Sequence, residues 1–390
     1  MEQVCDYSIC TGCGVCSSVC PKACISFVEG KKGHLYPKID PKKCIDCKKC
    51  QRTCPALKTQ TGIMPTVAYA AFTRNEYDYK TTTSGGAAQV LSQYILDKGG
   101  VVYGCAVMPG ADVRHIRVTT SNELERLKGS KYVQSNLLDI FPLIKKDVKE
   151  GLTVLFIGVP CQVASIISLF GKKPDNLILV DLICHGVPSL ASLQNYLNKH
   201  IGDLSKIQQL RFRTSSGFQI VASGLEQNFN RKKNIYESVP LAKSPYGDEY
   251  YTPFFYGFSY RPSCYKCQYA KPSRISDITI GDFWGLNNNE LPSSFPNHQK
   301  GISVILPSTA KGNEMISQIK PFLHIAERPV EEAINGNKQL QHPTIRNFRI
   351  KIYEVLSPII GIKEALKLTN IDMRLRRTLR PYIRKNRNIR

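Results

Sequence analysis

Apolar and polar residues alternate along most of this chain in runs whose length and period predict strands and helices in succession. Short apolar runs rich in β-branched residues predict buried strands at residues 67–72, 101–107, 152–160, 177–186, 278–285 and 302–308. Amphipathic runs predict helices at residues 84–100, 161–170 and 189–200. In the first of these helices, Ser84 is the expected N-cap and Gly99 lies near the expected C-terminal end. This strand–helix–strand order predicts a partly parallel sheet covered by helices.

The first 60 residues break this pattern because cysteine dominates them. Ten of the 15 cysteines lie among the first 54 of the 390 residues. A segment this short buries too little apolar surface to fold alone, so bound metal is expected to stabilise it. The sequence opens without an apolar leader, which disfavours export and a disulfide framework.

The spacing of these cysteines predicts the kind of metal. The pattern C-x2-C-x2-C-x3-C-P occurs twice, at Cys10, Cys13, Cys16 and Cys20, and again at Cys44, Cys47, Cys50 and Cys54. In two-cluster bacterial ferredoxins with this spacing, the fourth cysteine of each run ligates the cluster of the other run. The expected ligand sets for two 4Fe-4S clusters are therefore Cys10, Cys13, Cys16 and Cys54, and Cys44, Cys47, Cys50 and Cys20. Zinc is the alternative, but it prefers separated C-x2-C pairs. We interpret Cys5 and Cys24, which stand outside the pattern, as small apolar residues.

Four later cysteines predict a third metal site. The pair Cys264 and Cys267 forms an isolated C-x2-C, which needs partners. Cys161 begins a predicted helix and Cys184 ends a predicted strand, and ligands of such sheets gather beyond the carboxyl ends of strands. The spacing leaves a 4Fe-4S cluster and a zinc ion as alternatives.

Seven blocks of the sequence resemble the beta subunit family of coenzyme F420 hydrogenase and dehydrogenase, in order, between about residues 66 and 308. They are SGG (84–86), VVYGCAV (101–107), GSKYVQS (129–135), LFIGVPCQ (155–162), VDLICHGVPS (180–189), RPSCYKCQYA (261–270) and DITIGDFWG (277–285). The resemblance implies an FAD-binding iron–sulfur protein that passes electrons between one-electron and two-electron carriers. It favours a 4Fe-4S cluster over zinc at the third site. It also suggests reduced ferredoxin or coenzyme F420 as electron donor, and a role as a reductase in surface-polysaccharide metabolism.

The residues that would hold FAD follow from the resemblance together with donor chemistry, because no G-x-G-x-x-G fingerprint is present. The helix start at Ser84, Gly85 and Gly86 offers backbone N–H groups to a pyrophosphate, unless it is an ordinary cap. Further candidate donors are Ser130, Lys131, Gln134, Ser135, His115 and Arg117. A solvated strand face is the alternative for the segment that contains His115 and Arg117. His185 is the candidate for proton transfer, with a structural histidine as the alternative, and Trp284 is expected in the core.

Charge adds one more expectation. The formal net charge is +22, and residues 373–390 contain eight Lys or Arg and no acidic residue. Leu368, Leu375, Leu379 and Ile383 recur there at near-helical spacing. The pattern predicts an amphipathic helix on an anionic membrane or a partner protein, with a solvated tail as the alternative. No motif indicates nucleic-acid binding.

Together these observations predict an α+β protein in three parts. A ferredoxin-like domain with two 4Fe-4S clusters is expected at residues 1–60 and a larger α/β-type flavin-binding domain with a mixed sheet at residues 66–340. A basic, helical tail is expected at residues 341–390. The expected function is a flavin-dependent iron–sulfur oxidoreductase with a small-molecule substrate or a redox partner protein. A non-catalytic electron-transfer subunit is the alternative. We expect a cytoplasmic protein that contacts the membrane only through its tail.

Overall fold

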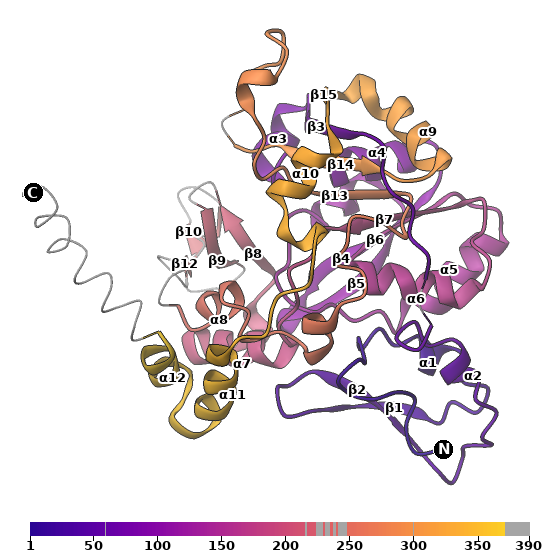
Figure 1. Cartoon of the computed structure of the whole chain (residues 1–390), viewed down its shortest axis with the longest axis vertical. Helices are drawn as coiled ribbons and strands as arrows, with labels where there is room; N and C mark the ends of the chain where they lie inside the picture. Colours follow the sequence, from indigo (N-terminus) through magenta and orange to yellow (C-terminus); the bar gives the residue numbers. More distant parts are fainter. Residues whose placement is uncertain are drawn as a thin grey trace, which may run out of the picture.

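The N-terminal domain is small and built from short elements. The structure, a computed structural model, describes residues 1–58, 60–214, 217–223, 229–230, 235–236, 239–240, 248–298 and 300–370. Helices α1 (Val15–Ser18) and α2 (Lys49–Arg52) lie beside an antiparallel hairpin of β1 (Ile25–Glu29) and β2 (Leu35–Ile39). Figure 1 shows this domain under the helices α5 and α6 of the larger domain.

An eight-stranded mixed sheet organises the larger domain. Its strand order is β15 (Leu323–Arg328), β3 (Ala68–Thr73), β14 (Ser303–Pro307), β13 (Ile278–Asp282), β7 (Leu177–Leu182), β6 (Val154–Gly158), β4 (Val101–Met108) and β5 (Asp112–Val118). The four strands β13, β7, β6 and β4 run parallel, and antiparallel strands flank them on both sides. The predicted mixed sheet and α+β class are therefore confirmed.

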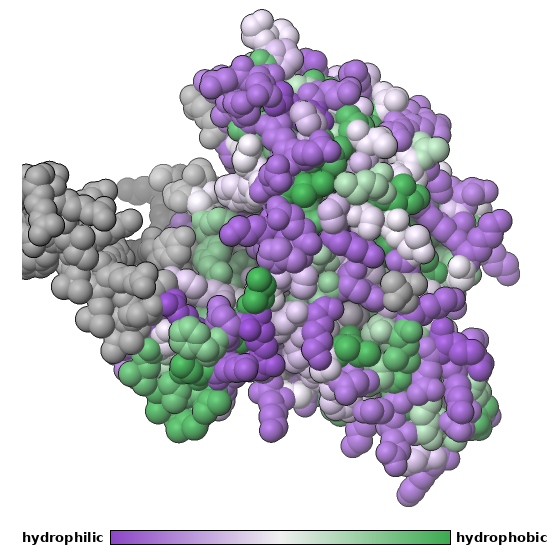
Figure 2. All heavy atoms as spheres, viewed as in Figure 1, coloured by the Kyte–Doolittle hydropathy of each residue, from purple (hydrophilic) through white to green (hydrophobic). Residues whose placement is uncertain are grey.

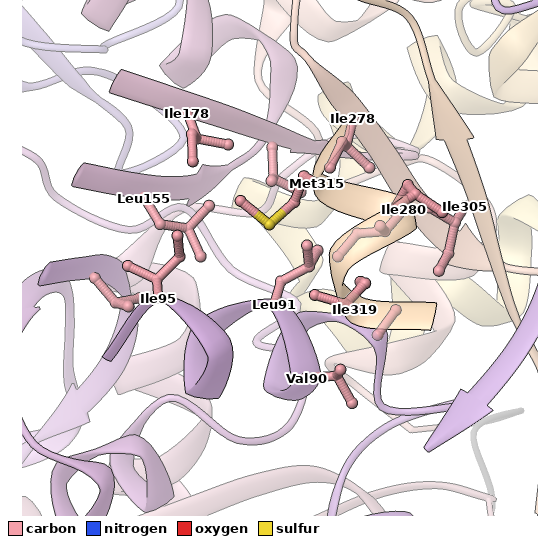
Figure 3. Close-up of a cluster of buried hydrophobic side chains, with 14 of the residues drawn as sticks. Val90, Leu91, Ile95, Leu155, Ile178, Ile278, Ile280, Ile305, Met315 and Ile319 are labelled. Atoms are coloured by element: carbon pink, nitrogen blue, oxygen red, sulfur yellow. The ribbon is translucent and has the colours of Figure 1, made fainter. Parts of the chain in front are cut away.

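Side chains alternate between the two faces of this sheet, and a different layer of helices covers each face. On one face, Leu155 and Ile178 pack against α4 (Ala87–Asp97) and α9 (Ala310–Ile319). Figure 3 shows Leu91 and Ile95 of α4 and Met315 and Ile319 of α9 pointing into this cluster. Their position explains why the central strands read as continuous apolar runs.

On the other face, the ferredoxin domain shares a core with the larger domain. The neighbours Val154 and Phe156 pack against α5 (Ile140–Lys149) and α6 (Pro160–Phe170). Val15 and Val19, from α1 and its C-cap, belong to the same cluster. The two domains are therefore joined by buried apolar surface as well as by the chain.

The predicted linker at residues 58–65 is packed rather than loose. The Gln60 side-chain amide donates to the Ala164 carbonyl oxygen of α6 at 3.0 Å. Ile63 and Arg274 exchange two backbone hydrogen bonds of 2.7 and 2.8 Å. This segment holds the N-terminal domain in place along α6.

The remaining elements surround the sheet. They are α3 (Glu76–Thr81), α7 (Leu190–Ile201), β8 (Gln209–Thr214), β9 (Gly217–Ser223), β10 (Phe229–Asn230), β11 (Ile235–Tyr236), β12 (Val239–Pro240), α8 (Tyr251–Phe255), α10 (Val330–Gly336), α11 (Phe348–Ile360) and α12 (Ile362–Thr369). The predicted basic helix at residues 373–390, with Leu375, Leu379 and Ile383, lies outside the described residues. Within the described part of the chain, no helix is long and apolar enough to cross a membrane.

Candidate functional site

The first predicted ligand set surrounds one pocket in the N-terminal domain. Its lining includes Cys10, Cys13, Cys16 and Cys54. The space between the lining residues, with its mouth, is about 290 Å³. Gly12 and Gly14 have φ angles of 65° and 88°, which lets one tight segment turn three cysteines inward.

The second predicted set surrounds another pocket of the same domain. Its lining includes Cys20, Cys44, Cys47 and Cys50, around about 320 Å³. Each pocket thus takes three cysteines from one run and the fourth from the other, which is the arrangement that the spacing predicts. This second pocket lies nearer to solvent, since Cys47 is exposed whereas Cys10, Cys16 and Cys54 are buried.

Cys5 and Cys24 are buried, as small apolar residues would be, but each also touches a predicted ligand. The Cys24 sulfur lies 3.4 Å from the Cys20 sulfur. Cys5 shares hydrogen bonds with Cys10 and Cys54, and these bonds, the one from Cys10 first, raise the pKa of Cys5. The two residues therefore shape the surroundings of the predicted ligands, which the spacing did not reveal.

The four later cysteines come together at the carboxyl edge of the parallel strands. Cys161 is the second residue of α6, Cys184 follows β7, and Cys264 and Cys267 lie in and after a 3₁₀ turn at Pro262–Lys266. Burial raises the pKa of all four thiols. Charges on the other three raise the pKa of Cys161 further. Four such thiols would ionise together only around a bound cation, so their chemistry fits a metal site.

This third cysteine set lies next to the first. A charge on Cys13 also acts on Cys161. Buried Tyr269 lies beside both sets: its pKa is raised by burial, then by Cys161, Cys13 and Cys267. The amide of Gln268 donates to the carbonyl oxygen of Pro55, the residue after Cys54, at 2.7 Å. The order of the sets through the protein is therefore second, first, third.

Arg261 connects the first cysteine set to the larger domain. Its guanidinium is fully buried and donates to the Cys10 carbonyl oxygen at 2.6 Å and the Leu35 carbonyl oxygen at 2.7 Å. One of its nitrogens lies 3.6 Å from the Cys10 sulfur. Its described partners are carbonyls, an amide and this sulfur, so the charge of a ligated Cys10 would compensate it. Gln134, a predicted FAD residue, instead joins Arg261 to the Thr11 carbonyl oxygen.

The predicted phosphate cradle has a different geometry from the expected cap. Helix α4 begins at Ala87 with Gly86 as N-cap, and Ser84 has a left-handed φ of 57°. The Ser84 hydroxyl donates to the Ile302 carbonyl oxygen at 2.8 Å, so Ser84 does not cap the helix as predicted. The Gly85 N–H donates to the Ser303 hydroxyl at 3.0 Å. The loop is thus tied to β14 while the helix N-terminus stays directed outward.

The segment with Ser130 and Lys131 lies beside this loop. The Ser130 N–H donates to the Thr83 hydroxyl at 3.0 Å. The Lys131 ammonium donates to the carbonyl oxygens of Leu127 and Lys128 at 2.8 and 2.9 Å. Burial lowers the pKa of Lys131 to about 8, and a charge on Arg211 opposes its protonation too.

Further cations gather at the same place. Burial lowers the pKa of Lys300, and charges on Arg211 and Arg213 lower it further. Arg213 is paired with Asp282, at the carboxyl end of β13, at 2.7 Å. Positive charge beside an outward helix N-terminus suits a phosphate group. Sequence reasoning missed Arg211 and Lys300, which only the fold brings together.

His115 and Ser135 form a buried hydrogen-bonded chain with Gln162. The His115 Nε2–H donates to the Ile157 carbonyl oxygen at 2.9 Å, so Nδ1 accepts from the Ser135 hydroxyl at 3.0 Å. The Gln162 amide in turn donates to the Ser135 hydroxyl at 2.9 Å. Burial lowers the pKa of His115 to about 4, which keeps the imidazole neutral.

Arg117 has a structural partner. Its guanidinium donates to both carboxylate oxygens of Asp147 on α5, at 2.7 and 2.9 Å. Tyr103 also donates to Asp147. Arg117 is thus held on the α5 face of β5, in neither of the situations that the sequence suggested.

Two residues near the carboxyl edge complete this region. His185 is exposed, and although loss of hydration lowers its pKa, Asp282 raises it. Trp284 is 49% exposed, so its predicted place in the core is wrong. Among the described residues, no group of three or more His, Cys, Asp or Glu is arranged to hold a single metal ion.

Comparison with known proteins identifies the N-terminal domain. Residues 9–57 and, in an overlapping match, residues 36–94 correspond to 4Fe-4S dicluster domains. An uncharacterized ferredoxin of Methanocaldococcus jannaschii is 36% identical over 55 residues, which are 14% of this chain and 70% of that protein. A ferredoxin-like protein of the nif region of Sinorhizobium fredii is 43% identical over 58 residues, 13% of this chain and 83% of that protein.

Residues 151–333 match the family described as the C terminus of the coenzyme F420 hydrogenase/dehydrogenase beta subunit. A chain of the F420-reducing NiFe hydrogenase complex from Methanosarcina barkeri aligns with a TM-score of 0.43 and 18% identity, over 72% of this chain and 92% of that one. This similarity is too low to support an argument. The family matches make the protein an iron–sulfur electron-transfer protein. The chain therefore belongs to the coenzyme F420 hydrogenase/dehydrogenase beta subunit family and carries a 4Fe-4S dicluster ferredoxin domain at its N-terminal end.

Proposed function

We propose that the protein is an iron–sulfur flavoprotein oxidoreductase in which three 4Fe-4S clusters connect the protein surface to an FAD site. The observation that carries this proposal is the position of Cys161, Cys184, Cys264 and Cys267. They lie beside the first cysteine set on one side and at the carboxyl edge of the sheet on the other. A 4Fe-4S cluster suits this position better than zinc, because zinc has no redox chemistry and would interrupt the path of the electrons.

FAD, when bound, would exchange electrons in pairs with one partner and singly with another. Its phosphates would lie at Ser84, Gly85, Gly86 and Ser130, where Lys131, Lys300 and Arg211 supply positive charge. His115 and Ser135 hold the wall formed by the start of α6 in place. His185 is the exposed group that could exchange protons with solvent.

Anaerobic reconstitution with iron and sulfide, followed by iron counting and flavin extraction, tests the proposal. We expect about 12 iron atoms and one FAD per chain. About eight iron atoms with one zinc would refute the third cluster, and absence of flavin from fully loaded protein would refute the FAD site.

The alternative function is a non-catalytic electron-transfer subunit. It is favoured by His115, whose two ring nitrogens are both engaged in hydrogen bonds and whose pKa is far below neutral. Reduction of a soluble acceptor by the isolated, loaded chain would favour the enzyme, and strict dependence on a second protein would favour the electron-transfer role. Reduced ferredoxin and coenzyme F420 are the donors to test, and a glycan-linked acceptor tests the proposed role in polysaccharide metabolism.

We also propose peripheral contact between the C-terminal region and an anionic membrane. Helix α11 exposes Phe348, Ile352, Val355 and Ile359, which recur at helical spacing. Figure 2 shows hydrophobic residues gathered over α11 and α12. The basic residues of 373–390 follow directly in the sequence, and such a combination is typical of helices that lie on anionic lipid.

A further inference from the structure

The second cysteine pocket opens onto a surface with an unusual composition. Its lining includes Ile45, Cys47, Lys22 and Lys48 beside the other cysteines. Ile45 is 58% exposed and Cys47 is exposed as well. A cluster held there would thus lie under a thin cover of one apolar side chain and lysine stems.

Positive charge surrounds this opening. Residues 38–52 contain six Lys or Arg, all exposed, against two Asp. One of the two, Asp46, lies 3.9 Å from the N-terminal ammonium, and the other, Asp40, lies 4.0 Å from Lys43. Within the described part of the chain, Lys22 and Lys48 form no ion pair. Even with about −2 from a bound 4Fe-4S cluster and its thiolates, the rim keeps a positive balance.

We propose that this surface, made of Lys22, Ile45, Cys47, Lys48 and Lys49, is the docking site of an acidic single-electron carrier protein. The inference rests on the proposed function and names the partner of its outermost cluster. An exposed apolar contact within a ring of one charge sign is the arrangement that steers a partner of opposite charge and then seats it. In the transfer, one electron leaves the reduced carrier, which is oxidised by one unit, and the cluster is reduced by one. No covalent bond forms or breaks.

The surface is far along the electron path from the flavin candidates, which explains why a separate partner site is useful. The second set lies beyond the first set from Cys161, and the first set is buried. Single electrons would therefore enter or leave at this exposed end, while the two-electron partner uses the other end.

The test compares two matched charge reversals in the full-length, cluster-loaded protein. Lys22→Glu with Lys48→Glu changes the docking surface, and Lys145→Glu with Lys149→Glu makes the same charge change on the exposed side of α5. Stopped-flow association with a reduced, acidic two-cluster bacterial ferredoxin is followed from low to high salt. We expect at least a tenfold lower association rate constant and a flatter salt dependence for the first variant, and wild-type behaviour for the control.

Equal rate constants for the two variants would overturn the inference, as would a rate constant for the wild type that does not depend on salt. Iron content and bleaching by dithionite are measured on the same samples. If both match the expectation while association is unchanged, docking fails and the proposed cofactors stand. Protein without iron refutes the proposed function itself.

Discussion

Arg261 offers the sharpest test of the link between the two domains. We predict that Arg261→Met lowers the midpoint potential of the cluster held by the first cysteine set. Removing a positive charge makes the addition of an electron to that cluster less favourable, so the potential becomes more negative.

The magnitude follows from the distance of 3.6 Å between the guanidinium nitrogen and the Cys10 sulfur. A unit charge at that distance is worth about 5 kcal/mol at an effective dielectric constant of about 20, or about 200 mV for a one-electron couple. This value is an upper bound, because an added electron spreads over the cluster beyond the sulfur. We therefore expect a fall on the order of 100 mV.

The assay is an anaerobic redox titration followed by electron paramagnetic resonance. Arg261→Lys keeps the charge and should retain most of the potential, although a lysine cannot reach all the carbonyls that the guanidinium fork reaches. Arg126→Met, on the exposed surface, controls for net charge. An unchanged potential in Arg261→Met with full iron content would refute the reasoning. Equal falls in the Met and Lys variants would show that packing, and not charge, sets the potential.

Four other predictions test separate parts of the structure. Cys264→Ala should lower the iron content from about 12 to about eight atoms per chain with both ferredoxin clusters retained, whereas unchanged iron would contradict the third site. Although burial alone raises the pKa of Asp147, its hydrogen bonds with Arg117 and Tyr103 hold that pKa below its ordinary value. The stabilisation is therefore present above about pH 4 and is lost as the pH falls further, so Arg117→Met should cost on the order of 2 kcal/mol in urea unfolding at pH 7 and little at pH 3, and equal losses at both values would contradict this. Gly86→Ala, at φ 78°, should weaken FAD binding roughly fivefold, because its new methyl meets Thr82 and Thr73, while Gly99→Ala, at φ 74° in open space on the same helix, should not, and similar flavin titrations for the two would argue against the cradle. Val355→Ser with Ile359→Ser should reduce sedimentation with anionic vesicles, unlike Leu143→Ser on exposed α5, and no difference between them would remove α11 from the membrane contact.

The sequence was most informative where chemistry or period is local. The doubled cysteine spacing predicts which cysteine of one run faces the other, and Cys20 and Cys54 do line the opposite pockets. The strands also lie where the apolar runs predict them, because the parallel strands are buried on both faces.

Features that depend on distant segments could not be predicted. Arg261 lies 251 residues after Cys10, and a lone arginine in a loop carries no pattern that marks it as buried. The true cap of α4 is Gly86, because the hydroxyl of Ser84 is taken by β14, a strand more than 200 residues away. Gln134 likewise turned toward the ferredoxin domain, since its partners lie at Thr11 and Arg261.

The apolar cluster that Val15 and Val19 share with α5 and α6 has a consequence for how the protein can evolve and work. A carrier module on a flexible tether can swing between partners, and can be exchanged for a foreign module during evolution. Here the methyl group that an alanine would add at Gly14 would strike Leu138, and Phe141 lies close behind it. The ferredoxin portion is therefore a fixed terminal of the larger domain, whose spacing to the next redox site is set by side-chain packing, and a transplanted module would need a compensating change in α5.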